Sequence, residues 1–151
     1  MFMSIALSLH VLAIVVWVGG MFFAHQALRP AAVSTLEPPL RLQLWVATFK
    51  RFFPWVWVCV VLVLATGLWM MLQFPKAPIF VHAMLGLGIV MMLIFMHVFF
   101  APYNRLKKAV AEQRWPDGGN ALGQIRTMVG INTVIGIVTI IIATAGKFFI
   151  Q

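Results

Sequence analysis

Four histidines, the only ones in the chain, lie at matched intervals inside two hydrophobic stretches. His10 and His25 belong to the first stretch, and His82 and His97 belong to the second; each pair is fifteen residues apart. On an α-helix this interval corresponds to about 22 Å of rise and about 60° of rotation, so both imidazoles of a pair lie on one broad face near opposite ends of the helix. Two such helices, side by side and parallel, would form an outer pair, His10 with His82, and an inner pair, His25 with His97.

Two imidazoles that face each other across a helical bundle are the axial ligands of a bis-histidine haem. The spacing therefore predicts two haem b groups with irons about 20 Å apart, which would carry electrons across or at a membrane. The electron donor and acceptor are left open, with a quinone or a small oxidant among the choices. Small residues beside the ligands would admit a porphyrin, although such residues also serve helix packing; they are Gly19, Gly20, Ala24 and Gly86.

Copper is the alternative metal for the same histidines, because imidazole and thioether groups both bind it. The chain has ten methionines, and besides Met1 four of them lie toward the end that carries His10 and His82. These four are Met3, Met70, Met71 and Met84. Most methionines are nevertheless interpreted as packing residues of an apolar interior.

The composition indicates a small polytopic membrane protein. Of the 151 residues, 63% are hydrophobic and 9% are charged, whereas about a quarter of the residues of a soluble domain are charged. The net charge of +8 comes from cations between the apolar blocks, where they set membrane topology, so nucleic-acid binding is excluded. Cys59 is the single cysteine and lies inside an apolar run, which excludes an intramolecular disulfide.

Four apolar blocks are long enough to cross a bilayer, which takes about 20 residues each. The blocks cover about 4–28, 53–74, 79–101 and 127–150, and they predict an all-α, integral membrane four-helix bundle in a single domain, 1–151. Prolines mark several expected ends: Pro30 closes the first helix, Pro54 starts the second and Pro102 closes the third. The first block has no preceding basic residue and is longer than a secretory signal, so we expect a retained helix.

Two segments between the blocks hold nine of the eleven Lys and Arg residues. These are Arg29–Phe52, in which Leu40–Phe52 is typical of an interfacial amphipathic helix, and Pro102–Arg126, in which Pro116–Asn120 is a turn. The positive-inside rule places both segments in the cytoplasm and both termini in the periplasm. Some of these cations would lie near enough to pair with haem propionates: Arg29, Lys50, Arg51, Arg105 and Arg126.

No catalytic motif accompanies the histidines. Glu37, Glu112 and Asp117 are the only acids, and all three fall in the connecting segments, so no buried carboxylate can relay protons. The chain has no phosphate-binding glycine loop and no nucleophile–base motif. Enzymatic activity is therefore left open, with a membrane haem oxidoreductase as the form it would take.

Three stretches resemble a known family: LHVLAIVVWVGGMFFAHQALRP at Leu9–Pro30, KRFFPWVWV at 50–58 and TGLW at Thr66–Trp69. They are similar to the CopD family of bacterial inner-membrane proteins, named for copper resistance, and the resemblance covers nearly the whole chain as one four-helix module. It implies a copper-linked or haem-linked role, with the lipid bilayer as a partner and a homo-oligomer left open.

A more distant resemblance is to the HemJ-like protoporphyrinogen oxidases, which hold a single haem. Their first-helix histidine corresponds to His10. They also carry a lysine two residues after a third-helix histidine, where this chain has Met84 after His82. This departure argues against porphyrinogen oxidation.

Overall fold

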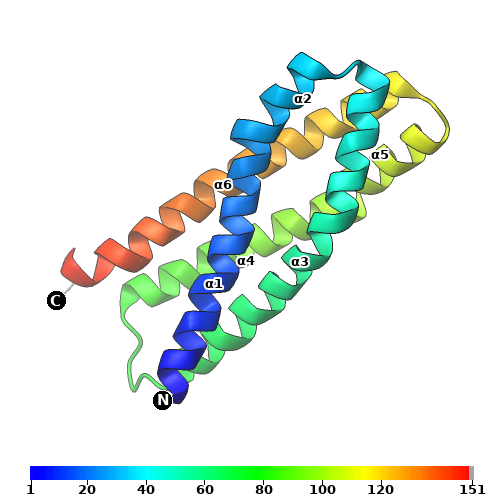
Figure 1. The fold of residues 1–151 in the computed structure, drawn as a ribbon. Coiled ribbons are helices and arrows are strands. Elements are labelled where there is room, and N and C mark those ends of the chain that lie inside the picture. Colours follow the sequence, from blue (N-terminus) through cyan, green and yellow to red (C-terminus); the bar gives the residue numbers. More distant parts are fainter. Residues whose placement is uncertain (150–151) are drawn as a thin grey trace.

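A computed structural model describes residues 1–149, and every regular element in that part of the chain is a helix (Figure 1). The elements are α1 (Phe2–Phe23), the π-helical turn η1 (Ala24–Leu28), α2 (Arg29–Thr35), α3 (Pro38–Leu72), α4 (Ile79–Phe100), α5 (Pro102–Ala111) and α6 (Trp115–Phe149). The predicted all-α bundle is confirmed. Ile150, with which the sequence ends its fourth block, lies outside the described residues.

Four helical segments are long and apolar enough to cross a membrane, as the sequence predicted. They are Phe2–Thr35, Pro38–Leu72, Ile79–Ala111 and Trp115–Gly146. Each has at least 32 residues and therefore rises about 50 Å, whereas the hydrocarbon core of a bilayer is about 30 Å thick. The helices are consequently longer than the hydrocarbon core that they would cross.

This excess length corrects the predicted connecting segments. Arg29–Phe52 is not a loop: α1, η1 and α2 form one continuous rod to Thr35, and α3 begins at Pro38. Leu40–Phe52 is not a separate interfacial helix but the first part of α3. The reason is physical: hydropathy marks where an apolar block leaves the membrane, and a polar helix can continue past that level.

Two prolines do not have the predicted effect. Pro30 does not close the first helix, because η1 precedes it and the Arg29 N–H reaches back five residues to the Ala24 carbonyl. This wide turn makes room for the proline ring, which in a regular α-helix would clash with the carbonyl four residues earlier. Pro54 lies inside α3 rather than at its start, and it is exposed, as membrane helices tolerate.

The turn predicted at Pro116–Asn120 is also wrong. The chain breaks earlier, at 112–114, where Gln113 has a φ of 55°. Arg114 stabilises this break by donating hydrogen bonds to Glu112 (2.7 Å) and to Asp117. The bond to Glu112 makes the largest contribution to raising the pKa of the guanidinium, and the bond to Asp117 raises it further. Pro116 then lies in the first turn of α6, where a missing N–H costs nothing.

The packing order of the helices differs from the predicted one. In the described part of the chain, α1 packs on α3 and α6, and α4 packs mainly on α6, but no Cα atom of α1 lies within 8 Å of one in α4. The helices that carry the histidine pairs are therefore diagonal and not side by side. They meet only through side chains at the centre, where the Trp17 and Phe95 rings are 6.2 Å apart, edge to face.

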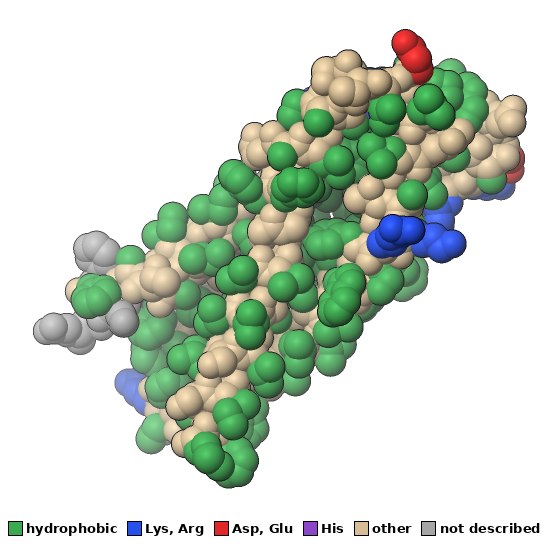
Figure 2. All heavy atoms as spheres, in the orientation of Figure 1, with side chains coloured by type: hydrophobic (Ala, Val, Ile, Leu, Met, Phe, Trp, Pro, Cys, Tyr) green, Lys and Arg blue, Asp and Glu red, His purple; other side chains and the backbone are tan. Residues whose placement is uncertain are grey.

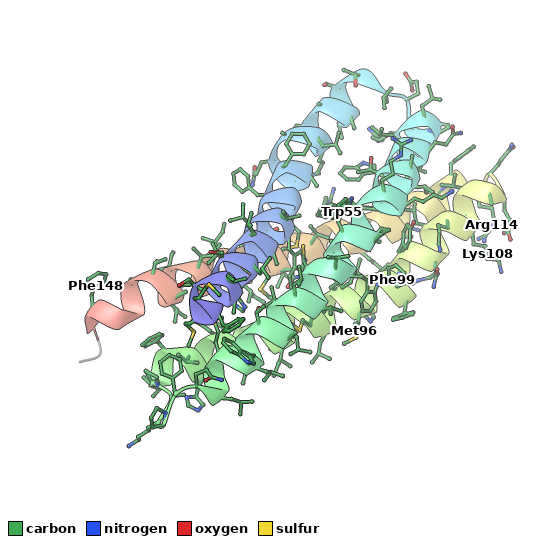
Figure 3. The ribbon with its side chains drawn as sticks, turned by 60° about the horizontal axis from the view of Figure 1, so that its bottom comes forward. Trp55, Met96, Phe99, Lys108, Arg114 and Phe148 are labelled. Atoms are coloured by element: carbon green, nitrogen blue, oxygen red, sulfur yellow. The ribbon has the colours of Figure 1, made fainter. Side chains whose placement is uncertain are left out.

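The two ends of the bundle differ in charge. The α2–α3 and α5–α6 connections lie at one end, and both termini lie at the other (Figure 1). Lys108 and Arg114 lie where α5 and α6 meet, and Phe148 lies at the opposite end (Figure 3). Hydrophobic side chains cover the surface between the ends (Figure 2), as expected for contact with lipid. We call the end with the α2–α3 and α5–α6 connections the basic end.

Candidate functional site

His10 is half-buried where α1 packs on α3. Its Nδ1 lies 2.8 Å from Oγ1 of Thr66, and its ring lies over Gly67, where an added Cβ would come within 3.1 Å of the imidazole Cε1. Both partners belong to the TGLW stretch. That stretch therefore forms the seat of this histidine, a role that the sequence alone did not indicate.

The Thr66 hydroxyl determines the tautomer of His10. Its one hydrogen is donated to the Leu62 carbonyl of its own helix, so Thr66 can only accept from the imidazole. Nδ1 of His10 is then the protonated nitrogen, and Nε2 carries a free lone pair. A histidine that binds a metal through one nitrogen usually donates the N–H of the other to such a partner.

His25 is half-buried and lies in the π-helical turn η1. Its ring contacts α6 at Gly130, where an added Cβ would be 3.2 Å from Nε2. π-helical turns inside α-helices are frequent at functional sites. The turn and the glycine together place the His25 imidazole against α6, whereas the His10 imidazole packs against α3.

The two histidines of α4 are exposed. His82 donates from Nδ1 to the Pro78 carbonyl (3.1 Å), and no hydrogen bond of the His97 side chain is found among the described residues. The structure brings His10 to Thr66 and not to His82, and no cluster of three or more His, Cys, Asp or Glu residues forms in the described part. The two bis-histidine pairs stay a prediction.

The inward face of α1 carries more than its histidines. Trp17 and Met21 are buried on it, between His10 and His25. Met21 precedes His25 by four residues, which places a thioether and an imidazole one turn apart on the same face. Met21 was not among the ligands predicted from the sequence, although its four-residue spacing from His25 indicates it.

A buried amide lies at the centre of the bundle. Asn132, which is 2% exposed, donates from Nδ2 to the Met91 carbonyl (3.3 Å) and contacts the Met21 sulfur (3.7 Å). Asn132 therefore bonds across helices, from α6 to α4, whereas the Thr133 hydroxyl donates within α6, to the Val129 carbonyl. The Asn132 Oδ1 atom is buried without a partner in the described part of the chain. Buried polar atoms without a hydrogen-bond partner are uncommon in folded proteins, so this oxygen keeps an unused capacity to accept.

A cavity of about 400 Å³ lies at the basic end, between η1, α2, α3 and α6. His25 lines it together with Arg29, Arg41 and Arg126. Trp45 and Trp115 also line it, and Trp45 is buried. We call this the basic-end cavity.

These features define a class: a small all-helical membrane protein with two inward imidazoles on its first helix and a polar group at mid-depth. A family model described as copper resistance protein D (CopD) matches residues 46–145, two thirds of the chain, so the chain belongs to the CopD family. The match covers α4 with His82 and His97, whereas His10 and His25 lie ahead of it. No curated protein and no solved structure gives a significant match.

Proposed function

We propose that this CopD-family protein binds copper as Cu(I) inside its bundle and passes it through the bacterial inner membrane. One observation carries the proposal: the hydrogen bond from His10 to Thr66 leaves the other imidazole nitrogen free as a ligand on the inward face of α1. Met21 and His25 lie on the same face, further toward the basic end.

The types of side chain inside the bundle favour a soft monovalent ion. Imidazole and thioether groups suit Cu(I), whereas Mg²⁺ and Ca²⁺ require oxygen ligands. Glu37, Glu112 and Asp117 are exposed, so none of these three carboxylates lines the interior. The Asn132 oxygen and the Met21 sulfur lie at mid-depth, where polar groups commonly mark an ion path.

The charge distribution sets the orientation of the chain in the membrane. The segments with nine of the eleven cations meet at the basic end, which the positive-inside rule places in the cytoplasm. His10 then lies toward the periplasm and His25 toward the cytoplasm. Both termini are periplasmic in this arrangement.

Copper binding is tested on purified protein in detergent by competition with a colorimetric Cu(I) chelator. Replacement of His10 by alanine, or of Met21 by leucine, should weaken Cu(I) binding at least tenfold, about 1.4 kcal/mol. Met96→Leu is the matched control, because Met96 lies in α4 outside its buried face and was not among the candidate ligands, and it should bind like the wild type. If the three variants bind Cu(I) equally, the interior ligands are not used and the proposal is wrong.

Haem-based electron transfer is the second candidate, and it rests on the position of His25. His25 lies in the wall of that cavity, and Arg29 and Arg126 could pair with propionates there. In the two-haem arrangement, His82→Ala should remove the outer haem and His97→Ala the inner one, as measured by haem content per chain. Under the copper proposal both variants leave Cu(I) binding unchanged and the preparation shows no Soret band.

A further inference from the structure

We propose that the basic-end cavity binds the headgroup of an anionic phospholipid: one phosphodiester oxyanion carried on acyl chains. This site is separate from the copper ligands of the bundle interior except for His25, and it does not depend on copper passage.

The charge of the cavity is unbalanced. Arg29, Arg41 and Arg126 come from α2, α3 and α6 and line one volume of about 400 Å³, and no acidic residue lines it. Among the described residues none of the three forms an ion pair, since both ion pairs belong to Arg114. Guanidinium groups match the oxygens of phosphate with two parallel hydrogen bonds, so three unpaired guanidiniums specify an oxyanion.

The remaining lining selects an amphiphile over a free anion. Aromatic and aliphatic side chains make up much of the wall; they include Leu42, Trp45, Phe49, Ile125 and Val129. Free phosphate gains nothing from such a surface, whereas the glycerol and first methylenes of a lipid can cover it. Basic pockets between membrane helices on the cytoplasmic side bind anionic headgroups for this reason.

The depth of the cavity agrees with a headgroup. Arg29 and Arg126 border the first and fourth apolar blocks, so they lie where the helices leave the hydrocarbon core. His25 is the only histidine in the lining, and a bis-histidine haem would need a second imidazole there. A lipid is therefore favoured over a porphyrin as the occupant.

The test uses the delipidated full chain in neutral detergent, titrated with phosphatidylglycerol or with phosphatidylcholine of the same acyl chains, and analysed by native mass spectrometry. One phosphatidylglycerol should be retained per chain, at least about tenfold more tightly than phosphatidylcholine. Arg41→Gln and Arg126→Gln should each weaken phosphatidylglycerol binding about fivefold. Arg51→Gln is the matched control, because Arg51 is an exposed arginine of α3 that does not line the cavity; it should stay within twofold of the wild type.

Each other outcome overturns the proposal. Equal binding of the two lipids shows that the cavity does not select a charge, and displacement of phosphatidylglycerol by millimolar inorganic phosphate shows a site for the free anion. A Soret-absorbing pigment that disappears in His25→Ala identifies a porphyrin as the occupant. If the glutamine variants do not fold, Arg126→Lys replaces them, because it keeps the charge and should keep the preference for phosphatidylglycerol. A folded wild-type protein that shows no preference for phosphatidylglycerol overturns the proposal without any variant.

Discussion

Replacement of Thr66 by valine tests the seat of His10 directly. The change keeps the shape of the side chain and removes the oxygen that lies 2.8 Å from Nδ1 of the imidazole. A hydrogen bond between membrane helices contributes on average about 0.6 kcal/mol, so the free energy of unfolding should fall by less than about 1.5 kcal/mol. The effect on Cu(I) should be larger, because loss of a partner that orients a metal-binding histidine weakens affinity about 10-fold to 100-fold.

Two measurements on each variant separate these effects. Cu(I) affinity comes from competition with a chelator, and the tautomer of His10 comes from the ¹⁵N chemical shifts of its ring in protein with labelled histidine. Wild-type His10 should have a protonated Nδ1, and Thr66→Val should give a mixture of tautomers. Thr66→Ser, which keeps the hydroxyl, should restore both the tautomer and the affinity.

The matched control is Thr139→Val in α6. Thr139 is half-buried and bonds to the Ile135 carbonyl four residues earlier, as Thr66 does to Leu62, but no hydrogen bond joins it to a histidine in the described part of the chain. It should change stability slightly and Cu(I) affinity not at all. The reasoning is refuted if Thr66→Val keeps a single Nδ1-protonated tautomer and the wild-type affinity.

Three further predictions concern packing, the central amide and topology. Gly136→Ala should destabilise the fold by about 1–3 kcal/mol, because the new Cβ would lie 2.8 Å from Cγ2 of Val18 and 3.1 Å from Cε of Met91. In the control Gly119→Ala the new Cβ meets no atom within 4 Å, so thermal unfolding of the two variants should differ. Asn132→Leu should leave the free energy of unfolding unchanged or raised, because it removes a buried oxygen without a partner. Copper uptake into proteoliposomes should fall in this variant, and unimpaired uptake would contradict the role of the Asn132 amide in copper passage. A reporter fused to the carboxyl terminus should be active only in the periplasm, and cytoplasmic activity would reverse the orientation.

The sequence predicted the number and nature of the membrane helices because apolar block length depends on bilayer thickness and not on tertiary contacts. It failed where helices leave the membrane: Arg29–Phe52 and Pro102–Arg126 are polar enough to read as loops, yet they are largely helical. It also could not anticipate that η1 would accommodate Pro30. Local composition does not encode a π-helical turn.

The sequence predicted which histidines share a face of one helix, but not which helices they would contact. Fifteen-residue spacing correctly indicated that two histidines can share a face of one helix, and His10 and His25 do lie on the inward side of α1. Which helices become neighbours depends on interdigitation of side chains across the whole bundle, and no spacing within one helix contains that information. The partners Thr66 and Gly130 therefore appear only in the structure.

The rotation of α4 separates the two proposals for the histidines. Its buried face is formed by Met91, Met92, Phe95 and Val98. At 100° per residue, His82 and His97 both point about 150° away from the centre of that face. An imidazole of α4 could face one of α1 only if α4 turned by that angle, which would move Phe95 away from Trp17 and Met91 away from Asn132.

The free-energy cost of such a rotation would come mainly from lost side-chain contacts. Exposure to lipid would add little, because lipid tails are as apolar as the side chains that the rotation would expose. The hydrogen bond from Asn132 to the Met91 carbonyl uses a backbone atom, and backbone atoms change partners when a helix turns. A porphyrin would therefore have to supply enough binding free energy to replace the Trp17, Phe95 and Asn132 contacts at the centre. The copper proposal needs no such rearrangement, since His10, Met21 and His25 already lie on the inward face of α1 and Asn132 of α6 already contacts Met21.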